Sequence, residues 1–249
     1  MSLFILMKQD FKNLMTNPTI FIFCFIYPPV LIFLFGFLFS NLYGSNIVTS
    51  YDFYGVTLMF YMLLGTITIT PNAFLENRIK SANLRIAYAP IPRYVVYISK
   101  ILSSYLFIGI TFTIDISVMQ LCHFVNYGGK QNIISVLILM YCMLAFSVTL
   151  GGAVCVLLKS EELTNKILTI IATAFAVFSG IFFPIASFGK WIAVFANYSP
   201  LKLVIDCAFQ LIYDGNSANY ISIIDGLLIC SVIFIIIIHI FYKPEDYLK

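Results

Sequence analysis

Long apolar runs, separated by short polar segments, divide the chain into six stretches that are long enough to cross a membrane. A spanning helix needs roughly 20 mostly apolar residues, because about 30 Å of hydrocarbon is crossed at about 1.5 Å per residue. The runs are continuous, whereas the strands of a membrane barrel alternate polar and apolar residues. The pattern therefore predicts six spanning helices, at residues 20–39, 53–75, 94–121, 133–158, 167–183 and 221–242.

Residues 1–17 have a different pattern. Apolar residues recur at helical spacing, with polar residues between them, at Leu3, Met7, Phe11 and Leu14. A helix with one apolar and one polar face lies in the membrane interface rather than across it. We therefore expect an interfacial amphipathic helix before the first span.

Residues 184–213, between the fifth and sixth predicted spans, contain two shorter apolar pieces, at residues 191–201 and 203–213. Each piece is too short to cross a bilayer, and Pro200 and Lys202 interrupt the apolar sequence. Backbone that enters a membrane only partway is tolerated where other protein segments surround it. The pattern favours an extracellular re-entrant hairpin, and an apolar extracellular loop is the alternative.

The composition agrees with a membrane protein. Of 249 residues, 61% are hydrophobic and 10% are charged, whereas a soluble domain has about 45–50% apolar and about 25% charged residues. This excludes a soluble enzyme and a free nucleic-acid-binding protein, and it excludes disorder, which requires low hydrophobicity. We expect an all-α polytopic membrane protein that forms one transmembrane domain over residues 1–249.

The distribution of basic residues predicts the orientation. If the N-terminus is cytoplasmic, six spans return the C-terminus to the same side, and 11 of the 14 basic residues then lie inside. Only Lys130, Lys190 and Lys202 lie outside. Since cytoplasmic loops are enriched in Lys and Arg, we expect a multi-pass protein of the cell membrane with both termini in the cytoplasm.

The sequence contains no pattern typical of a metal or nucleotide site. The six cysteines have no CxxC spacing, and His123 and His239 are predicted at opposite ends of their spans, so we expect no metal and no catalytic residue. A phosphate-binding loop requires GxxxxGK[ST], but the Gly189-Lys190 pair is followed by Trp191. Any ATP must therefore be hydrolysed by a partner, and we expect no cofactor on this chain.

An intramembrane protease is the alternative of another class. The Glu161-Glu162 pair with Lys166 is similar to the EExxxR signature of intramembrane prenyl-protein proteases. That chemistry needs arginine at the last position and histidines near the glutamates, and lysine stands here instead. We therefore expect a protein without enzymatic activity of its own, and keep the protease and a membrane immunity scaffold as alternatives.

Asp115 is the carboxylate that lies deepest inside a predicted span. Ionisable residues at such depth are costly and face a cavity or the bundle interior, which makes Asp115 a candidate pathway residue. The alternative is a local hydrogen bond with Thr111, one turn earlier on the same face. Lys100 and Asp225 lie close enough to span ends to reach water, and we assign them no role.

The loop at residues 76–94 alternates basic and apolar residues and stops at Pro90 and Pro92, since proline ends helices. A short amphipathic helix of this kind fits a groove in another protein. A basic loop on anionic lipid is the alternative. The loop itself leaves the two interpretations open.

The chain resembles the membrane subunits of type-2 ATP-binding-cassette exporters. In that family the loop after the second span begins with an acidic and basic stretch and closes with Pro-x-Ser-Arg, and this chain has Glu76, Arg78 and Lys80, followed by Pro90-Ile91-Pro92-Arg93. Residues 157–167 are similar to the family's short charged turn after the fourth span. Residues 179–209 are similar to its Gly-x-x-x-Pro, re-entrant hairpin and second proline.

The resemblance implies a mechanism. Two six-span subunits form the pathway, and each rests on a separate cytoplasmic ATPase that binds ATP and Mg²⁺. The implied coupling residues are Glu76, Arg78, Lys80, Leu84, Arg85, Ile86, Tyr88, Pro90, Arg93, Glu161 and Glu162. The implied gate is the outer hairpin with Gly180, Pro184 and Pro200. Because the predicted spans carry few charges, we expect hydrophobic or amphipathic cargo such as drugs, antimicrobial peptides or lipids, and polysaccharide or teichoic-acid export is the alternative.

Overall fold

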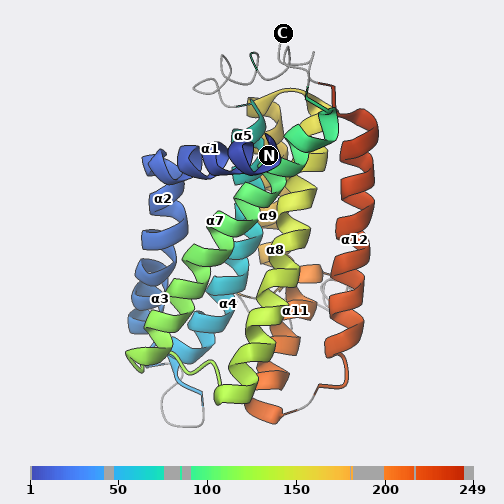
Figure 1. The fold of residues 1–249 in the computed structure, drawn as a ribbon. Helices are drawn as coiled ribbons and strands as arrows, with labels where there is room; N and C mark the ends of the chain where they lie inside the picture. The colour runs from blue at the N-terminus through green and yellow to red at the C-terminus, as the bar shows by residue number, and fades with distance from the viewer. Residues whose placement is uncertain are drawn as a thin grey trace.

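The computed structural model describes residues 2–41, 48–75, 85, 91–179, 181, 199–215 and 217–243, and these ranges contain helices and no strands. Six helical segments are long and apolar enough to cross a membrane, and they form a bundle (Figure 1). The predicted all-α polytopic membrane fold is therefore confirmed. The segments are Pro18–Leu38, Ser50–Leu75, Arg93–Leu121, Asn132–Leu158, Glu161–Ser179 and Tyr220–Phe241.

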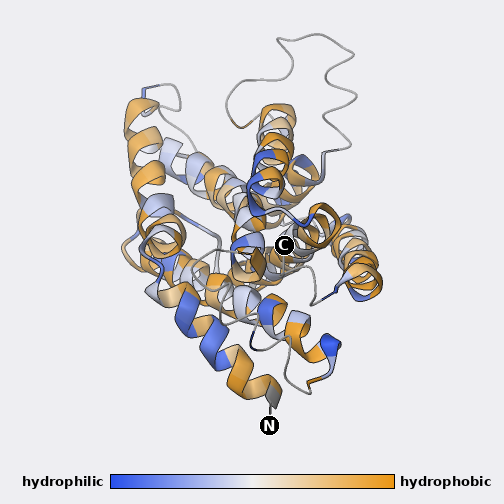
Figure 2. Ribbon diagram, turned by 90° about the horizontal axis from the view of Figure 1, so that it is seen from above, coloured by the Kyte–Doolittle hydropathy of each residue, from blue (hydrophilic) through white to orange (hydrophobic). Residues whose placement is uncertain are grey.

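Helix α1 (Ser2–Thr16) lies crosswise to the spanning helices at one end of the bundle (Figure 1). Figure 2 looks along the bundle and shows α1 stretched along its edge, with hydrophilic and hydrophobic residues interspersed. This crosswise placement is what an interfacial helix requires. We refer to this end of the molecule as the α1 end.

The first span consists of α2 (Pro18–Phe21), a π-helical turn η1 (Ile22–Ile26) and α3 (Tyr27–Leu38). The side chain of Asn17 accepts hydrogen bonds from backbone N–H groups at the start of α2, which sets the corner between α1 and the span. The wide turn ends two residues before Pro28, whose ring lacks an N–H donor and crowds the preceding turn of a regular helix. The sequence therefore accounts for both the corner and the widened turn.

The second span is the most central one and consists of α4 (Ser50–Gly65), the 3₁₀ turn η2 (Thr66–Thr68) and α5 (Ile69–Leu75). At η2 the backbone approaches the fourth span closely. A Cβ atom added to Gly151 would collide with the carbonyl oxygen of Ile67. Glycine at this position is what allows the two helices to touch backbone to backbone.

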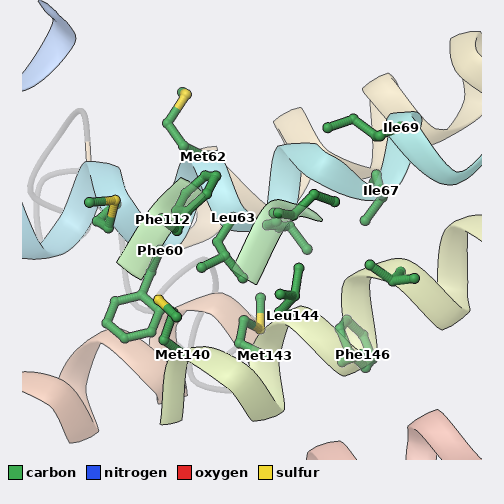
Figure 3. Close-up of a cluster of buried hydrophobic side chains, with 14 of the residues drawn as sticks. Phe60, Met62, Leu63, Ile67, Ile69, Phe112, Met140, Met143, Leu144 and Phe146 are labelled. Atoms are coloured by element: carbon green, nitrogen blue, oxygen red, sulfur yellow. The ribbon is translucent and has the colours of Figure 1, made fainter. Parts of the chain in front are cut away.

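The hydrophobic core lies between α4, α7 (Arg93–Leu121) and α8 (Lys130–Leu158), whose buried side chains interlock in the middle of the bundle (Figure 3). Aromatic, aliphatic and methionine side chains contribute together, and methionine fills irregular gaps between helices. The labelled core residues include Phe60, Leu63, Ile67, Phe112, Met140, Met143, Leu144 and Phe146.

The fifth and sixth spans are α9 (Glu161–Ser179) and α12 (Tyr220–Phe241). The fifth begins six residues before the predicted position of 167, because Glu161 and Glu162 form its first turn. Acidic side chains stabilise the N-terminal turn of a helix by interacting with its dipole. The two charged residues therefore extend the helix beyond its apolar part.

Between these spans, α11 (Pro200–Phe209) continues into the π-helical turn η5 (Gln210–Asp214) and packs on α4 and α9. Figure 1 shows α11 confined to the half of the bundle that is remote from α1. Pro200 is the first residue of α11, where a missing N–H costs nothing. This is the second piece of the predicted re-entrant hairpin, and residues 184–198 lie outside the described ranges.

Candidate functional site

The predicted coupling residues that the structure describes gather at the α1 end. Arg93 is the first residue of α7, and Glu161 and Glu162 form the first turn of α9, and both helices start at this end (Figure 1). Arg85 is helical and exposed. The other predicted residues lie outside the described ranges: Glu76, Arg78, Lys80, Leu84, Ile86, Tyr88, Pro90, Gly180 and Pro184.

The turn between α8 and α9 is built by local geometry. Lys159 ends α8 in the left-handed conformation, with a φ of 55°. Lys166 Nζ contacts Glu162 Oε1 at 2.6 Å one helical turn away, and both side chains are exposed. Asn165 Nδ2 donates to Asn72 Oδ1 at 3.2 Å, which joins α9 to α5. The start of α9 thus presents charged side chains, while the Asn165 side chain ties it to the second span.

The residues of the protease alternative do not assemble into a metal site. Within the described ranges, no group of three or more His, Cys, Asp or Glu residues is arranged to hold a metal ion. The Glu162 side chain is paired with Lys166 instead. His123 lies in the turn after α7, at the end remote from α1, with a φ of 57°.

Lys100 does not reach water, which makes our expectation for this residue wrong. Its side chain is 1% exposed and lies inside the α1 end. The ammonium Nζ donates to the carbonyl oxygen of Ala73 in α5 at 2.7 Å and lies 3.6 Å from Asp10 Oδ1 in α1. A buried cation is tolerated only with such partners. Lys100 therefore connects three helices.

Asp10 completes this connection. Its Oδ2 accepts a hydrogen bond from Ser99 Oγ at 2.7 Å, and Ser103 Oγ donates to the carbonyl oxygen of Met7 at 3.1 Å. Sequence reasoning missed Asp10, although it follows Met7 by three positions and therefore lies on the apolar face of α1. We call Asp10, Ser99 and Lys100 the Asp10–Lys100 network.

Asp115 is 4% exposed and lies inside the subunit. Its Oδ2 has no hydrogen-bond partner among the described residues. The Thr111 hydroxyl donates to the carbonyl oxygens of Phe107 and Ile108, at 3.2 and 2.9 Å. The expected alternative, a local Thr111–Asp115 hydrogen bond, is therefore not formed. Asp115 Oδ2 is buried without a hydrogen bond to any described residue.

A second buried polar cluster, which the sequence did not indicate, lies at the opposite end. Asp52 Oδ1 accepts from the backbone N–H of Asn126 at 2.7 Å, and the Tyr127 hydroxyl donates to the carbonyl oxygen of Gly55 at 3.2 Å. Burial raises the pKa of Tyr127, and the nearby carboxylates of Asp115 and Asp52 raise it further. Asp115 therefore lies near enough to Tyr127 to affect the charge of this cluster.

Part of the chain matches a known protein family. A family model described as "ABC-2 type transporter" matches residues 1–213. The matched region contains α1, five of the six spanning segments and α11. No curated protein matches the chain at a significant score.

Proposed function

The chain belongs to the ABC-2 type transporter family, and we propose that it couples ATP hydrolysis by a separate cytoplasmic ATPase to export across the cell membrane. Members of this family are membrane components of ABC-2 type transporters, and membership implies a cytoplasmic ATPase partner. In the proposal, ATP and Mg²⁺ bind to that partner, and this chain supplies the pathway together with a second permease subunit.

The Asp10–Lys100 network is the observation that supports coupling. The loop at residues 76–92 joins the end of α5 to the start of α7, and Lys100 holds these two helices together through Ala73. Asp10 attaches α1 to the same point. A force applied to the loop by an ATPase therefore moves α5, α7 and α1 as one unit, because their connection is buried and hydrogen-bonded.

The exposed faces of the spans support a proposal for the pathway. Between Leu228 and Ile236, every exposed side chain of α12 is aliphatic, which suits lipid. The exposed face of α9 instead mixes Ile170 with Thr169 and Thr173, whose hydroxyls bond to carbonyls one turn earlier. We place this mixed face of α9 against the pathway and the second subunit, and the exposed face of α12 against lipid.

The same surfaces favour hydrophobic or amphipathic cargo, such as drugs, antimicrobial peptides or lipids. A polysaccharide or teichoic acid requires a continuous polar lining, whereas the exposed face of α9 interrupts its polar side chains with apolar ones such as Ile170 and Val177. Because the Asp115 carboxylate is buried and lacks a described partner for Oδ2, we propose that it faces the pathway in another state of the transport cycle.

The Asp115 proposal predicts that Asp115→Asn changes export activity and leaves the amount of protein in the membrane unchanged. The substitution keeps the shape of the side chain and removes its charge. Efflux of a hydrophobic dye from cells, normalised to membrane-protein level, measures the effect. A fully active variant would assign Asp115 a structural role only.

Affinity purification of the tagged full chain tests the partner. We expect an ATPase with a phosphate-binding loop to co-purify, and to be lost from the variants Leu84→Asp and Arg85→Glu. Lys12→Glu, at an exposed position of α1, is the matched control and should retain it. A chain that purifies without an ATPase, with transport unaffected by these variants, would favour the membrane immunity scaffold.

A further inference from the structure

A groove of about 240 Å³ lies between α1 and α7, where the interfacial helix crosses the third span (Figure 1). Leu106 follows Ser103 by three residues, so it lies about 5 Å further from the α1 end. The groove therefore opens on the side of α1 that faces the membrane. Its lining consists of Phe4, Met7, Lys8, Phe11, Ser103 and Leu106.

The wall of the groove is apolar and is fixed by contacts between the two helices. The Phe11 and Phe107 rings contact each other edge to face, at 5.7 Å between centroids. Ser103 Oγ donates to the carbonyl oxygen of Met7 at 3.1 Å, so this hydroxyl is already hydrogen-bonded. Apart from Lys8, the lining side chains therefore offer a ligand apolar surface, which suits a hydrocarbon chain.

Exposed apolar side chains of α7 continue from the groove toward the middle of the bilayer. Leu106, Ile110 and Ile114 recur every four residues, and each is exposed. They cover about 12 Å along the helix, at about 1.5 Å per residue. One leaflet contributes about 15 Å of the hydrocarbon thickness. An acyl chain that begins in the groove can therefore lie along α7 for most of its leaflet.

The charged side chain that lines the groove is a lysine. Lys8 is exposed, and it forms no ion pair with a described residue. Asp10, the acidic residue of α1, contacts Lys100 and Ser99 inside the bundle instead. The charges that α1 exposes are therefore both positive, on Lys8 and Lys12. A lysine ammonium binds the oxygens of a phosphate group.

We propose that this groove binds an anionic phospholipid. Lys8 holds the phosphate group, and one acyl chain lies under α1 and continues over Leu106 and Ile110. An anionic head group is favoured over a zwitterionic one, because α1 exposes no acidic side chain that could bind a choline group. The lipid joins α1 to α7 at the surface, as the Asp10–Lys100 network joins them inside the bundle.

The proposal depends on neither the transported cargo nor the ATPase, so the purified full chain alone tests it. Native mass spectrometry in mixed micelles compares the retention of phosphatidylglycerol and phosphatidylcholine with identical acyl chains. We expect phosphatidylglycerol to be retained preferentially. Lys8→Gln should lower its affinity about fivefold, because one cation near the surface is removed. Lys12→Gln removes an exposed cation outside the groove lining and, as the matched control, should keep the wild-type preference.

A second pair of variants tests the acyl chain. Leu106→Trp fills the groove and should lower the affinity of both lipids, whereas Ile229→Trp, at an exposed position of α12, should lower neither. Equal losses within either pair of variants, or no preference in the wild-type protein, would overturn the site. Displacement of bound phosphatidylglycerol by an excess of glycerol phosphate, which has no acyl chain, would overturn the lipid as the ligand, whereas its persistence supports it.

Discussion

Lys100 shows how one buried cation fixes the position of an entire helix. Its ammonium is excluded from water and is held by Ala73 and Asp10. Removal of one partner from a buried charge pair is costly, because the remaining charge keeps its desolvation penalty without compensation. The attachment of α1 therefore depends on Asp10 as well as on the apolar residues around it.

This dependence predicts that Asp10→Ala destabilises the protein by about 3–5 kcal/mol. The combination Asp10→Ala with Lys100→Met should recover part of the loss, because no buried charge then remains unpaired. Thermal unfolding of the purified variants in one detergent measures both effects. Asp225→Ala, at an exposed position of α12, is the control and should stay within about 0.5 kcal/mol of the wild-type protein. Equal melting temperatures for Asp10→Ala and Asp225→Ala would show that the Asp10–Lys100 network does not stabilise the protein.

At the scale of elements, glycine decides how closely two spans approach. The carbonyl oxygen of Ile67 occupies the space that a Cβ atom at Gly151 would need, whereas nothing lies within 4 Å of the corresponding position at Gly226 in α12. A backbone carbonyl cannot rotate away as a side chain does. A side chain at Gly151 would therefore force α8 and η2 apart.

We therefore expect Gly151→Ala to lower the free energy of unfolding by about 1–3 kcal/mol, because the added methyl group overpacks the contact. Gly226→Ala should be neutral or stabilise by up to about 1 kcal/mol, because alanine has the higher helix propensity. Melting temperatures of the two purified variants compare the same chemical change at a crowded and an open position. A wild-type melting temperature for Gly151→Ala would show that the two helices can separate without cost.

The elements that follow from local patterns could be predicted, and contacts between distant residues could not. Continuous apolar runs located the six spans, because the length of a span is set by the bilayer. The first turn of α9 was missed, since Glu161 and Glu162 contribute to a helix through its dipole and not through hydrophobicity. The pairing of Asp10 with Lys100 depends on how α1 folds back over α7, which no local spacing encodes.

At the scale of the whole molecule, the exposed faces of α9 and α12 differ in chemistry and so in expected neighbours. Cys122 is exposed, so it is replaced by serine in the variants of this experiment. In that background we expect Thr173→Cys to form a disulfide-linked dimer on mild oxidation in membranes, since the mixed face of α9 is placed at the subunit contact. Ile236→Cys on α12 is the control and should remain monomeric. Non-reducing gel electrophoresis separates the outcomes. A dimer formed through Ile236→Cys alone would contradict this arrangement.

The central claim is that a separate ATPase drives export through this chain. Proteoliposomes that contain the full chain and its co-purified ATPase, loaded with ATP and Mg²⁺ on the ATPase side, test it by the movement of a hydrophobic fluorescent dye. The account predicts ATP-dependent transport that Arg85→Glu reduces at least tenfold, about 1.4 kcal/mol of lost coupling, while Lys12→Glu leaves it unchanged. Transport that continues without the ATPase, or equal transport by Arg85→Glu and the wild-type protein, would contradict it.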